Sequence, residues 1–394
     1  MRIPINTLLI GALLLSGCSA MRMDREVAAP TPAPAVPSVP IVELRGDPQQ
    51  IGTTHGARFA QVIQMLHDQY LLPLLQGQLV AFEARFEAAS FEAYMLPEHR
   101  AEVDALAKAA GINHFDALLG QCFLDLMPQA SCSTIALPAS ASLDGVARLG
   151  GNLDFESLQI ADKHSVVFIY HPNGRYQFAA IGWPGMIGVL SGMNERGLCL
   201  RCMEVPRGVR PASAMPYTLL YRTILEQCAD VDQAIDLLRR TPRQTANNLM
   251  LMDAAGNRAV AEIRPEGVVV RRGRPDAALL STNHQRGQDN DTPGLCWRYD
   301  SMHAASAAQF GHIDTADLQK ILATVVQGDG GDFTIQSMIF EPANRVLYLA
   351  AGADAPARGY QRIDLRPYFE NRKTTEPPRA RNDIQSGQIL VAEY

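Results

Sequence analysis

Hydrophobic residues recur at spacings of three and four along residues 57–126, a region rich in Ala, Leu, Gln, Glu and Phe. At this spacing Phe59, Val62, Leu66 and Tyr70 would share one face of an α-helix. The pattern therefore predicts an all-helical segment in the first third of the chain.

After Pro128 the apolar residues form short β-favouring runs, which Gly, Pro and Asn separate. Runs of this kind predict successive antiparallel strands. The expected strands are residues 133–137, 146–155, 165–170, 176–181, 187–190, 198–205, 249–253, 258–263 and 267–271, followed by a hairpin of residues 337–340 with 345–349.

Two pairs of helices interrupt these strands. The apolar spacing returns to the helical period over residues 216–227 and 231–239, and Asp230 offers an N-cap for the second helix. A further pair is expected over residues 297–310 and 315–326. Strands and helices alternate in blocks rather than as βαβ repeats, which predicts an α+β protein in which helices cover two sheets.

The first residues have the pattern of an export signal. Arg2 supplies a positive charge, residues 8–15 form an apolar run, and residues 15–18 read Leu-Ser-Gly-Cys, a small-residue cleavage site that ends in cysteine. This segment resembles the lipobox of bacterial lipoproteins, which implies removal of residues 1–17 and acylation of Cys18. An ordinary signal peptide with an incidental cysteine is the alternative. The apolar run is too short to span a bilayer as a helix.

Residues 27–40 contain five prolines and no charge, so they predict an extended tether rather than part of a core. We therefore expect the protein to be anchored to the lipid bilayer through Cys18, in the bacterial cell envelope, facing the periplasm and at the outer rather than the inner membrane. The expected division is a signal peptide (1–17), a lipidated cysteine with a Pro/Ala-rich tether (18–41), a helical segment (42–131) and a β-rich catalytic segment (132–394).

Composition and charge narrow the chemistry. The chain is 47% hydrophobic and 19% charged, as expected for a globular domain, and its formal net charge of −6 disfavours nucleic acid as a partner. The nine histidines show no His-Glu-x-x-His or comparable ligand spacing, and the sequence has no Gly-x-Ser-x-Gly elbow and no phosphate loop. We therefore expect no metal and no cofactor.

Cys199 and Cys202 have the spacing of a redox or zinc pair, but they lie in a strand-like run. Residues three apart in a strand point to opposite faces, so the pair is interpreted as structural.

Cys132 is different, because it lies between the polar break at residues 128–131 and a predicted strand. At a chain's first residue, the α-amine, with a pKa of about 7.7 to 8.0, suits the deprotonation of a thiol.

Taken alone, Cys132 would more often be a small buried hydrophobic residue. Several motifs accompany it, however, and their order and spacing together resemble the acyl-coenzyme A:6-aminopenicillanic acid acyltransferase family over residues 42–367. The motifs are Leu-Arg-Gly at 44–46, Ile-Gly at 51–52, His-Gly at 55–56, Cys-Ser-Thr-Ile at 132–135, Gly-Asn-Leu-Asp-Phe at 151–155, Pro-Gly-Met-Ile-Gly at 184–188, Gly-Met-Asn-Glu-Arg-Gly-Leu at 192–198, Asn-Leu-Met-Leu-Met-Asp at 248–253, Ser-Thr-Asn-His at 281–284, Gln-Ser at 336–337 and Leu-Tyr-Leu at 347–349.

This family belongs to the Ntn (N-terminal nucleophile) hydrolases and is similar in design to choloylglycine (bile-salt) hydrolases and acid ceramidases. The resemblance implies a four-layer αββα sandwich of two antiparallel sheets with an N-terminal helical segment. It also implies self-cleavage between Ser131 and Cys132, and a site that comprises Cys132, Asp154, Asn194, Asn283 and Arg298. Asp154 would hold the freed α-amine, and Asn194 or Asn283 would donate to the oxyanion.

Two positions depart from the relatives. Ser131 replaces the glycine that usually precedes the nucleophile in the penicillin branch. Gly151 stands where bile-salt hydrolases and ceramidases have an arginine, three residues before the aspartate. The contacts of that arginine therefore cannot be transferred to this chain.

The expected function is hydrolysis of an N-acyl amide, or acyl transfer, through an acyl-enzyme on Cys132. A small acylated substrate such as an acyl-coenzyme A or an N-acyl amine is the expected partner. A non-catalytic ligand-binding or scaffold lipoprotein of the cell envelope is the alternative, and a Cys-His protease that uses His284 is a third possibility. Arg298 could also be a surface helix residue, and residues 194–197 have the composition of a hairpin loop.

Overall fold

The computed structural model describes residues 38–75, 78–127, 131–206, 212–287, 294–328 and 332–369. The expected signal peptide, the acylated Cys18 and most of the tether lie outside the described residues, as does the polar break at residues 128–130. Within the described ranges, no helix combines the length and the apolar character needed to cross a membrane.

The predicted helical segment is confirmed, and it begins earlier than expected. The first helix starts at Pro48 because Asp47 accepts a hydrogen bond from the Gln50 N–H (2.8 Å) while the Gln50 side chain accepts one from the Asp47 N–H (3.0 Å). The helices are α1 (Pro48–Leu66), α2 (Leu72–Leu74), α3 (Gln78–Glu92), α4 (Pro97–Ala110) and α5 (His114–Leu126), with a π-helical turn at His67–Leu71 between α1 and α2.

Close packing joins α1 to α4. A Cβ atom added at Gly52 would overlap the carbonyl oxygen of Glu102, and one added at Gly56 would overlap that of Leu106. Only glycine lets the two helix backbones approach this closely. The motifs that contain these glycines therefore hold the helical segment together.

The β-rich part forms two sheets. The eight-stranded sheet has the order β1-β4-β5-β6-β7-β8-β9-β10, and the six-stranded sheet has the order β11-β2-β3-β12-β13-β14. The strands are β1 (Ile41–Gly46), β2 (Ser131–Leu137), β3 (Arg148–Glu156), β4 (Val166–Pro172), β5 (Phe178–Gly182), β6 (Ser191–Asn194), β7 (Cys199–Glu204), β8 (Asn247–Met252), β9 (Arg258–Arg264), β10 (Gly267–Arg272), β11 (Leu279–Ser281), β12 (Asp332–Glu341), β13 (Val346–Ala351) and β14 (Gln361–Asp364).

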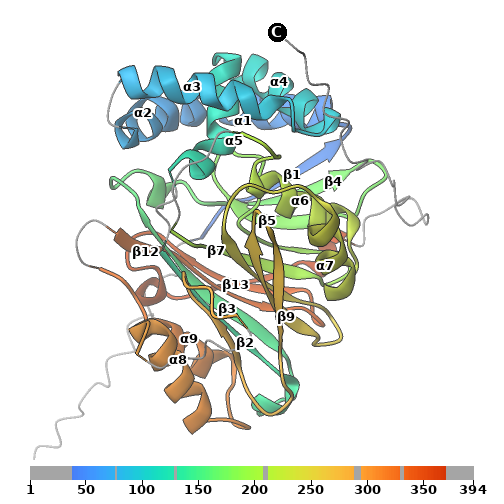
Figure 1. Ribbon diagram of the computed structural model, residues 1–394, viewed down its shortest axis with the longest axis vertical. Coiled ribbons are helices and arrows are strands. Elements are labelled where there is room, and N and C mark those ends of the chain that lie inside the picture. Colours follow the sequence, from blue (N-terminus) through green and yellow to red (C-terminus); the bar gives the residue numbers. More distant parts are fainter. Residues whose placement is uncertain are drawn as a thin grey trace, which may run out of the picture. The chain divides into compact units, whose positions relative to one another are not determined.

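The sheets pack face to face, with β2 of one sheet in contact with β7 of the other. Helices α6 (Tyr217–Gln227) and α7 (Val231–Arg240) pack on the eight-stranded sheet, whereas α8 (Trp297–Ala308) and α9 (Thr315–Ala323) pack on the six-stranded sheet. Figure 1 shows this order of layers, with the sheets between the two helix pairs. The αββα arrangement predicted from the sequence is therefore confirmed.

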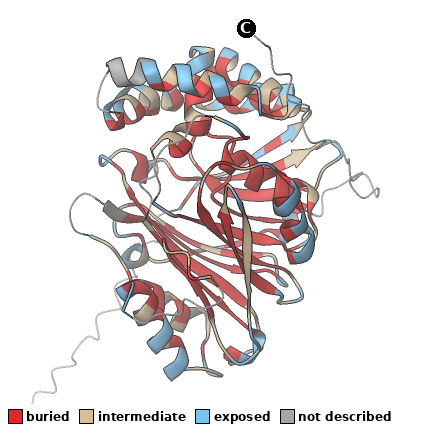
Figure 2. Cartoon of the chain, viewed as in Figure 1, coloured by how far each residue is buried: buried red, intermediate tan, exposed pale blue. Residues whose placement is uncertain are grey.

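Three clusters of buried side chains stabilise these layers. The largest fills the space between the two sheets, a second lies among the N-terminal helices, and a third lies between the six-stranded sheet and α8 and α9. The strands of both sheets are mostly buried, while the outer faces of the helices are exposed (Figure 2). Side chains that project between the sheets are therefore shielded from water.

Some details of the prediction are wrong. Residues 187–190 are not a strand, because Val189 donates its N–H to the carbonyl of Thr218 in α6 (2.9 Å) instead of to a neighbouring strand. The strand in this region is β6, which begins one residue later, at Ser191. In addition β1 pairs with β4 in parallel, so the eight-stranded sheet is mixed rather than antiparallel throughout.

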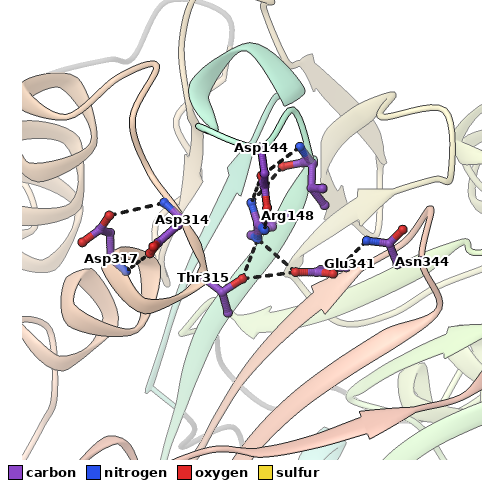
Figure 3. Close-up of polar contacts among 8 residues, drawn as sticks. Asp144, Arg148, Asp314, Thr315, Asp317, Glu341 and Asn344 are labelled. Carbon is purple, nitrogen blue, oxygen red and sulfur yellow. Dashed lines mark hydrogen bonds and ion pairs between the residues drawn. The ribbon is translucent and has the colours of Figure 1, made fainter.

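A polar network fixes one end of β3 (Figure 3). The Arg148 guanidinium donates to Asp144 (2.9 Å), to Thr315 in the first turn of α9 (2.9 Å) and to Glu341 at the end of β12 (3.2 Å). Because Arg148 is buried, these charge-assisted bonds hold β3, β12 and α9 in a defined register. The opposite ends of β3 and β12 carry the candidate site.

Candidate active site

Cys132 is the second residue of β2, and it lies opposite Leu153 of β3 in the strand register. Alternate residues of β2 face opposite ways: Cys132 and Ala136 join the core between the sheets, while Ile135 and Leu137 pack toward α8 and α9. The thiol therefore projects between the two sheets, and the residue is only 1% exposed.

Burial is the main influence on this thiol. It raises the pKa of Cys132 to about 12, and the nearby Asp154 carboxylate acts in the same direction. The positive charge of Arg201 opposes both. In the uncut chain the sulfur is therefore protonated at neutral pH and is a poor nucleophile.

Three of the predicted residues form a chain of hydrogen bonds that ends at the backbone nitrogen of Cys132. The side-chain oxygen of Asn283 accepts a hydrogen bond from this N–H (2.8 Å) and another from Nη2 of Arg298 (2.9 Å). Nη1 of Arg298 in turn donates to Oδ2 of Asp154 (3.0 Å). All four residues are buried, and the structure brings them into one hydrogen-bonded cluster.

The topology explains this convergence. Strand β11 pairs with β2 so that Ser281 lies opposite Thr134, and continuing this antiparallel register places Asn283 opposite Cys132. On the other side of β2, Asp154 lies opposite Ser131. Arg298 belongs to the first turn of α8, which packs on β2 and β11. Its interpretation as a surface residue is wrong, because it is buried.

Asn194 lies elsewhere. Its amide group donates to the carbonyl oxygens of Leu225 (2.9 Å) and Cys228 (2.8 Å), and its oxygen accepts from the N–H groups of Arg196 (3.1 Å) and Leu198 (3.0 Å). These bonds shape the turn after β6 and attach it to the end of α6. The structure does not bring Asn194 into the cluster around Cys132.

Two residues of this region had not been identified from the sequence. Thr334 of β12 donates from Oγ1 to Oδ1 of Asp154 (2.5 Å), which fixes the second carboxylate oxygen. Arg201 of β7 is fully buried. An arginine within the otherwise apolar run around residues 198–203 was the available signal for Arg201, whereas Thr334 is an ordinary strand residue and gives none.

The pair of cysteines in β7 has no ligand geometry. Both thiols are buried and free, and burial raises the pKa of both. The hydroxyl of Tyr221 in α6 contacts Cys202. Across the described ranges of the chain, no group of three or more His, Cys, Asp or Glu side chains could hold a metal ion.

An apolar cavity lies between α1, α5 and the segment that connects β5 to β6, and it reaches β3 at Leu153 and Phe155. Its empty volume, including the mouth, is about 820 Å³, and its walls include Leu66, Phe123, Trp183 and Leu153, the residue opposite Cys132. An extended hydrocarbon chain is the kind of group that such a surface binds.

Comparison with known proteins identifies a family and relatives that the chain resembles. The profile of the family "Acyl-coenzyme A:6-aminopenicillanic acid acyl-transferase" matches residues 144–356, a range that contains Asp154, Asn283 and Arg298 and begins after Cys132. Proteins dcd1A and dcd1B of Dictyostelium discoideum are 23% identical over 235 residues and 22% identical over 234 residues, which cover 52% and 53% of this chain. These matches cover 53% and 47% of the relatives, so the chain spans about half the length of the curated relatives that it matches.

Solved structures that resemble the chain include a mutant conjugated bile acid hydrolase from Clostridium perfringens, with a TM-score of 0.45, 16% identity and coverage of 59% of this chain and 92% of that one. A second is the Caenorhabditis elegans ortholog of N-acylethanolamine-hydrolyzing acid amidase, with a TM-score of 0.42, 18% identity and coverage of 54% and 93%. On the profile match, this chain belongs to the acyl-coenzyme A:6-aminopenicillanic acid acyltransferase family.

Proposed function

We propose that this protein is a self-cleaving cysteine hydrolase or acyltransferase that acts on an amide or other acyl bond, with Cys132 as its nucleophile. The observation that carries the proposal is the contact between the Cys132 nitrogen and Asn283, which Arg298 links to Asp154. The ion pair between Asp154 and Arg298 is costly to bury. Buried charged groups of this kind cluster at functional sites, which supports a catalytic role for this cluster.

Cleavage would begin when the Cys132 sulfur attacks the carbonyl carbon of Ser131. The bond from that carbon to the Cys132 nitrogen breaks, the nitrogen takes a proton, and a thioester remains. Water then hydrolyses the thioester, which leaves a carboxylate on Ser131 and both a free thiol and a free amine on Cys132. The new amine would remain beside the Asn283 oxygen that already accepts from this nitrogen.

In the mature enzyme the α-amine of Cys132 would take the proton of its own thiol, and the thiolate would attack the substrate carbonyl. The leaving amine takes that proton as the tetrahedral intermediate collapses to an acyl-enzyme. Water or a second amine then accepts the acyl group. The oxyanion donor expected at Asn194 or Asn283 stays a prediction. The Asn194 amide donates to the carbonyls of Leu225 and Cys228, away from the cluster. In the intact chain the Asn283 amide donates to the Glu204 carbonyl (2.7 Å).

The apolar cavity supports a substrate with an acyl chain, such as an N-acyl amine or an acyl-coenzyme A. Leu153 lines the cavity and lies opposite Cys132, so a chain bound there would place its carbonyl end toward the thiol.

We also propose, from residues 1–18 alone, that Cys18 anchors the protein in the bacterial envelope. Replacement of Cys18 by serine should then release the protein from the membrane fraction.

The test is N-terminal sequencing of active protein beside Cys132→Ala and Cys132→Ser variants, assayed with a series of N-acyl amines. The wild type should show a terminus at Cys132, and both variants should lose turnover. A matched control is Cys228→Ser, a buried free cysteine outside the cluster. Turnover by an uncut chain, or by Cys132→Ala, would favour the scaffold alternative.

The Cys-His alternative lacks comparable support. Nδ1 of His284 lies 3.4 Å from the Thr282 hydroxyl, and the group that contacts Cys132 is Asn283 rather than an imidazole. A His284→Gln variant that retains turnover would exclude this alternative.

A further inference from the structure

Arg201 is a buried cation that the mechanism above does not use. It lies in the middle of β7, and none of its surface is exposed. Its Nε donates weakly to the Ser191 hydroxyl (3.4 Å), while Nη1 and Nη2 have no hydrogen-bond partner among the residues that the structure describes. An unpaired charge in a protein core is costly, so such residues are rare unless they act on another group.

The guanidinium of Arg201 lies directly over β3. A Cβ atom added at Gly151 would overlap Nη1 of Arg201 and also the backbone carbonyl oxygen of Ser133, so only a glycine leaves room for the guanidinium in this position. Gly151 is on the same face of the six-stranded sheet as Leu153, the residue opposite Cys132. The side chain of Arg201 therefore reaches across the interface between the sheets to the face from which the thiol projects.

The two faces of β2 and β3 also differ in charge. Asp154 points away from this interface, toward Arg298 and Thr334, and its charge is already paired there. The thiol face carries Arg201 instead. Burial acts to lower the pKa of Arg201, and Cys132 is the charged neighbour that most strongly opposes this effect.

We propose that Arg201 stabilises the thiolate of Cys132 in the mature enzyme, in the space that Gly151 leaves for its guanidinium. This inference rests on the proposed function. The proton leaves the Cys132 sulfur for the α-amine of the same residue, and the negative charge left on sulfur faces the Arg201 cation. The α-ammonium of Cys132 forms beside Asn283, whereas the thiolate faces Arg201. The positive and negative charges of Cys132 therefore have different neighbours.

The role is a positioning and electrostatic one, and a pH profile distinguishes it from simple packing. We would measure the rate of iodoacetamide alkylation at Cys132 between pH 5 and 10 in self-cleaved protein, with peptide mass spectrometry to identify the site. The variants are Arg201→Met and Arg201→Lys. The control is Leu200→Met, which conserves volume on the same strand but points to the opposite face.

Loss of the positive charge should raise the pH midpoint of alkylation in Arg201→Met by roughly one unit or more, with a rate at pH 7 on the order of tenfold lower. Arg201→Lys should shift less, and Leu200→Met should match the wild type. A midpoint in Arg201→Met equal to that of the wild type would overturn the proposal.

If Arg201→Met does not fold or mature, the pH midpoint of alkylation of Cys132 in the wild type tests the proposal instead. A midpoint below about 8.5, the value of a free cysteine, supports stabilisation of the thiolate, and a midpoint at or above it contradicts the proposal. Absence of any terminus at Cys132 would refute the proposed function together with this inference. A normal terminus with an unshifted midpoint in Arg201→Met refutes the role of Arg201 alone.

Discussion

The side-chain oxygen of Asn283 lies 2.8 Å from the backbone nitrogen of Cys132, although 151 residues separate the two in the chain. The contact exists before any cleavage, so the intact fold already holds the nitrogen that would become the α-amine. Positioning of this kind removes the entropic cost of assembling a base beside its nucleophile.

Replacement of Asn283 by leucine should therefore slow both maturation and turnover. We expect a loss on the order of a hundredfold, since small misplacements of a reacting group have effects of this size. The measurement is the rate at which the Cys132 terminus appears, followed by kcat of the fraction that is cut. Asn344→Ala, which removes a polar contact near the surface, is the control and should be neutral. Unimpaired maturation of Asn283→Leu would show that the contact has no catalytic function.

Asp154 and Arg298 should also matter for stability. Asp154→Asn leaves the buried Arg298 without its counter-charge, which should lower the free energy of unfolding by about 3 to 5 kcal/mol. Thr334→Val removes one hydrogen bond to the carboxylate and should cost about 1.5 to 3 kcal/mol. Urea unfolding of an uncut Cys132→Ala background gives both values. Asp364→Asn, which breaks a more exposed pair with Arg366, should cost under about 1 kcal/mol.

Thiol labelling should change site on cleavage. In the uncut chain burial raises the pKa of Cys132 to about 12. For Cys296 burial again acts upward, but hydrogen bonds from the start of α8 and with Thr282 outweigh it and lower the pKa. Iodoacetamide at pH 8 should therefore label Cys296 in the intact chain and Cys132 only after cleavage. Peptide mass spectrometry, with Cys296→Ser as the control, identifies the modified residue. Strong labelling of Cys132 before cleavage would contradict this prediction.

The two chains should remain associated after cleavage. Glu102 in α4 pairs with Arg222 in α6 through two hydrogen bonds of 2.8 and 2.7 Å, and both side chains are buried. Because this pair joins segments on either side of Ser131, the mature protein should elute as one species in gel filtration. Glu102→Gln should weaken the association, whereas the exposed Glu87→Gln should not. Separation of wild-type chains in native buffer would be inconsistent with this arrangement.

Acid should weaken the packing of the N-terminal helical segment on the rest of the protein. Burial, assisted by the charge of Arg222, lowers the pKa of His55 to about 3, and its Nε2 accepts the Gly185 N–H (3.1 Å). The unfolded state binds a proton near the ordinary value of 6.5, so this contribution is present above that pH and is lost as the pH falls toward 3. Between pH 6.5 and 5 stability should fall by about 2 kcal/mol through His55. His55→Gln should flatten the dependence of the free energy of unfolding on pH, measured by urea unfolding. An unchanged dependence would show that His55 is not the source of the acid sensitivity.

The cavity predicts a selective effect on chain length. Gly120 lines it, and a Cβ atom there would meet only the Gly185 carbonyl oxygen, at 3.9 Å. Gly120→Leu should therefore fold and fill part of the cavity. It should raise KM for long N-acyl substrates on the order of tenfold or more while short ones change little. Gly120→Ala is the control. Equal effects on short and long chains would place the acyl group elsewhere.

The sequence predicted the layers well because their hydrophobic periods are local. Helices α6 and α7, and strands such as β7, follow from spacing and caps within a few residues. Strand β1 was missed because it pairs with β4, far along the chain, and local spacing cannot show a distant partner. Residues 187–190 looked like a strand because a buried loop and a buried strand are equally apolar.

Some residues of the candidate site could also be found from the sequence, and others could not. Asp154 and Asn283 lie in motifs of the family, and Arg298 was carried over from the resemblance without a motif of its own. Asn194 lies in an equally clear motif, yet its hydrogen bonds build a turn. The arginine in the apolar run of β7 marks Arg201 as unusual, but only the tertiary structure shows that its guanidinium lies over Gly151. Such contacts between sheets depend on tertiary structure, and no local pattern encodes them.

Strand β2 lies between β11 and β3 inside its sheet, rather than at an edge. A chain start created by a cut usually frays, because nothing holds the first residues on both sides. A cut before Cys132 would instead leave a terminus flanked by two neighbouring strands. Backbone hydrogen bonds to the neighbouring strands would then hold the new N-terminus in position while substrate binds and product leaves.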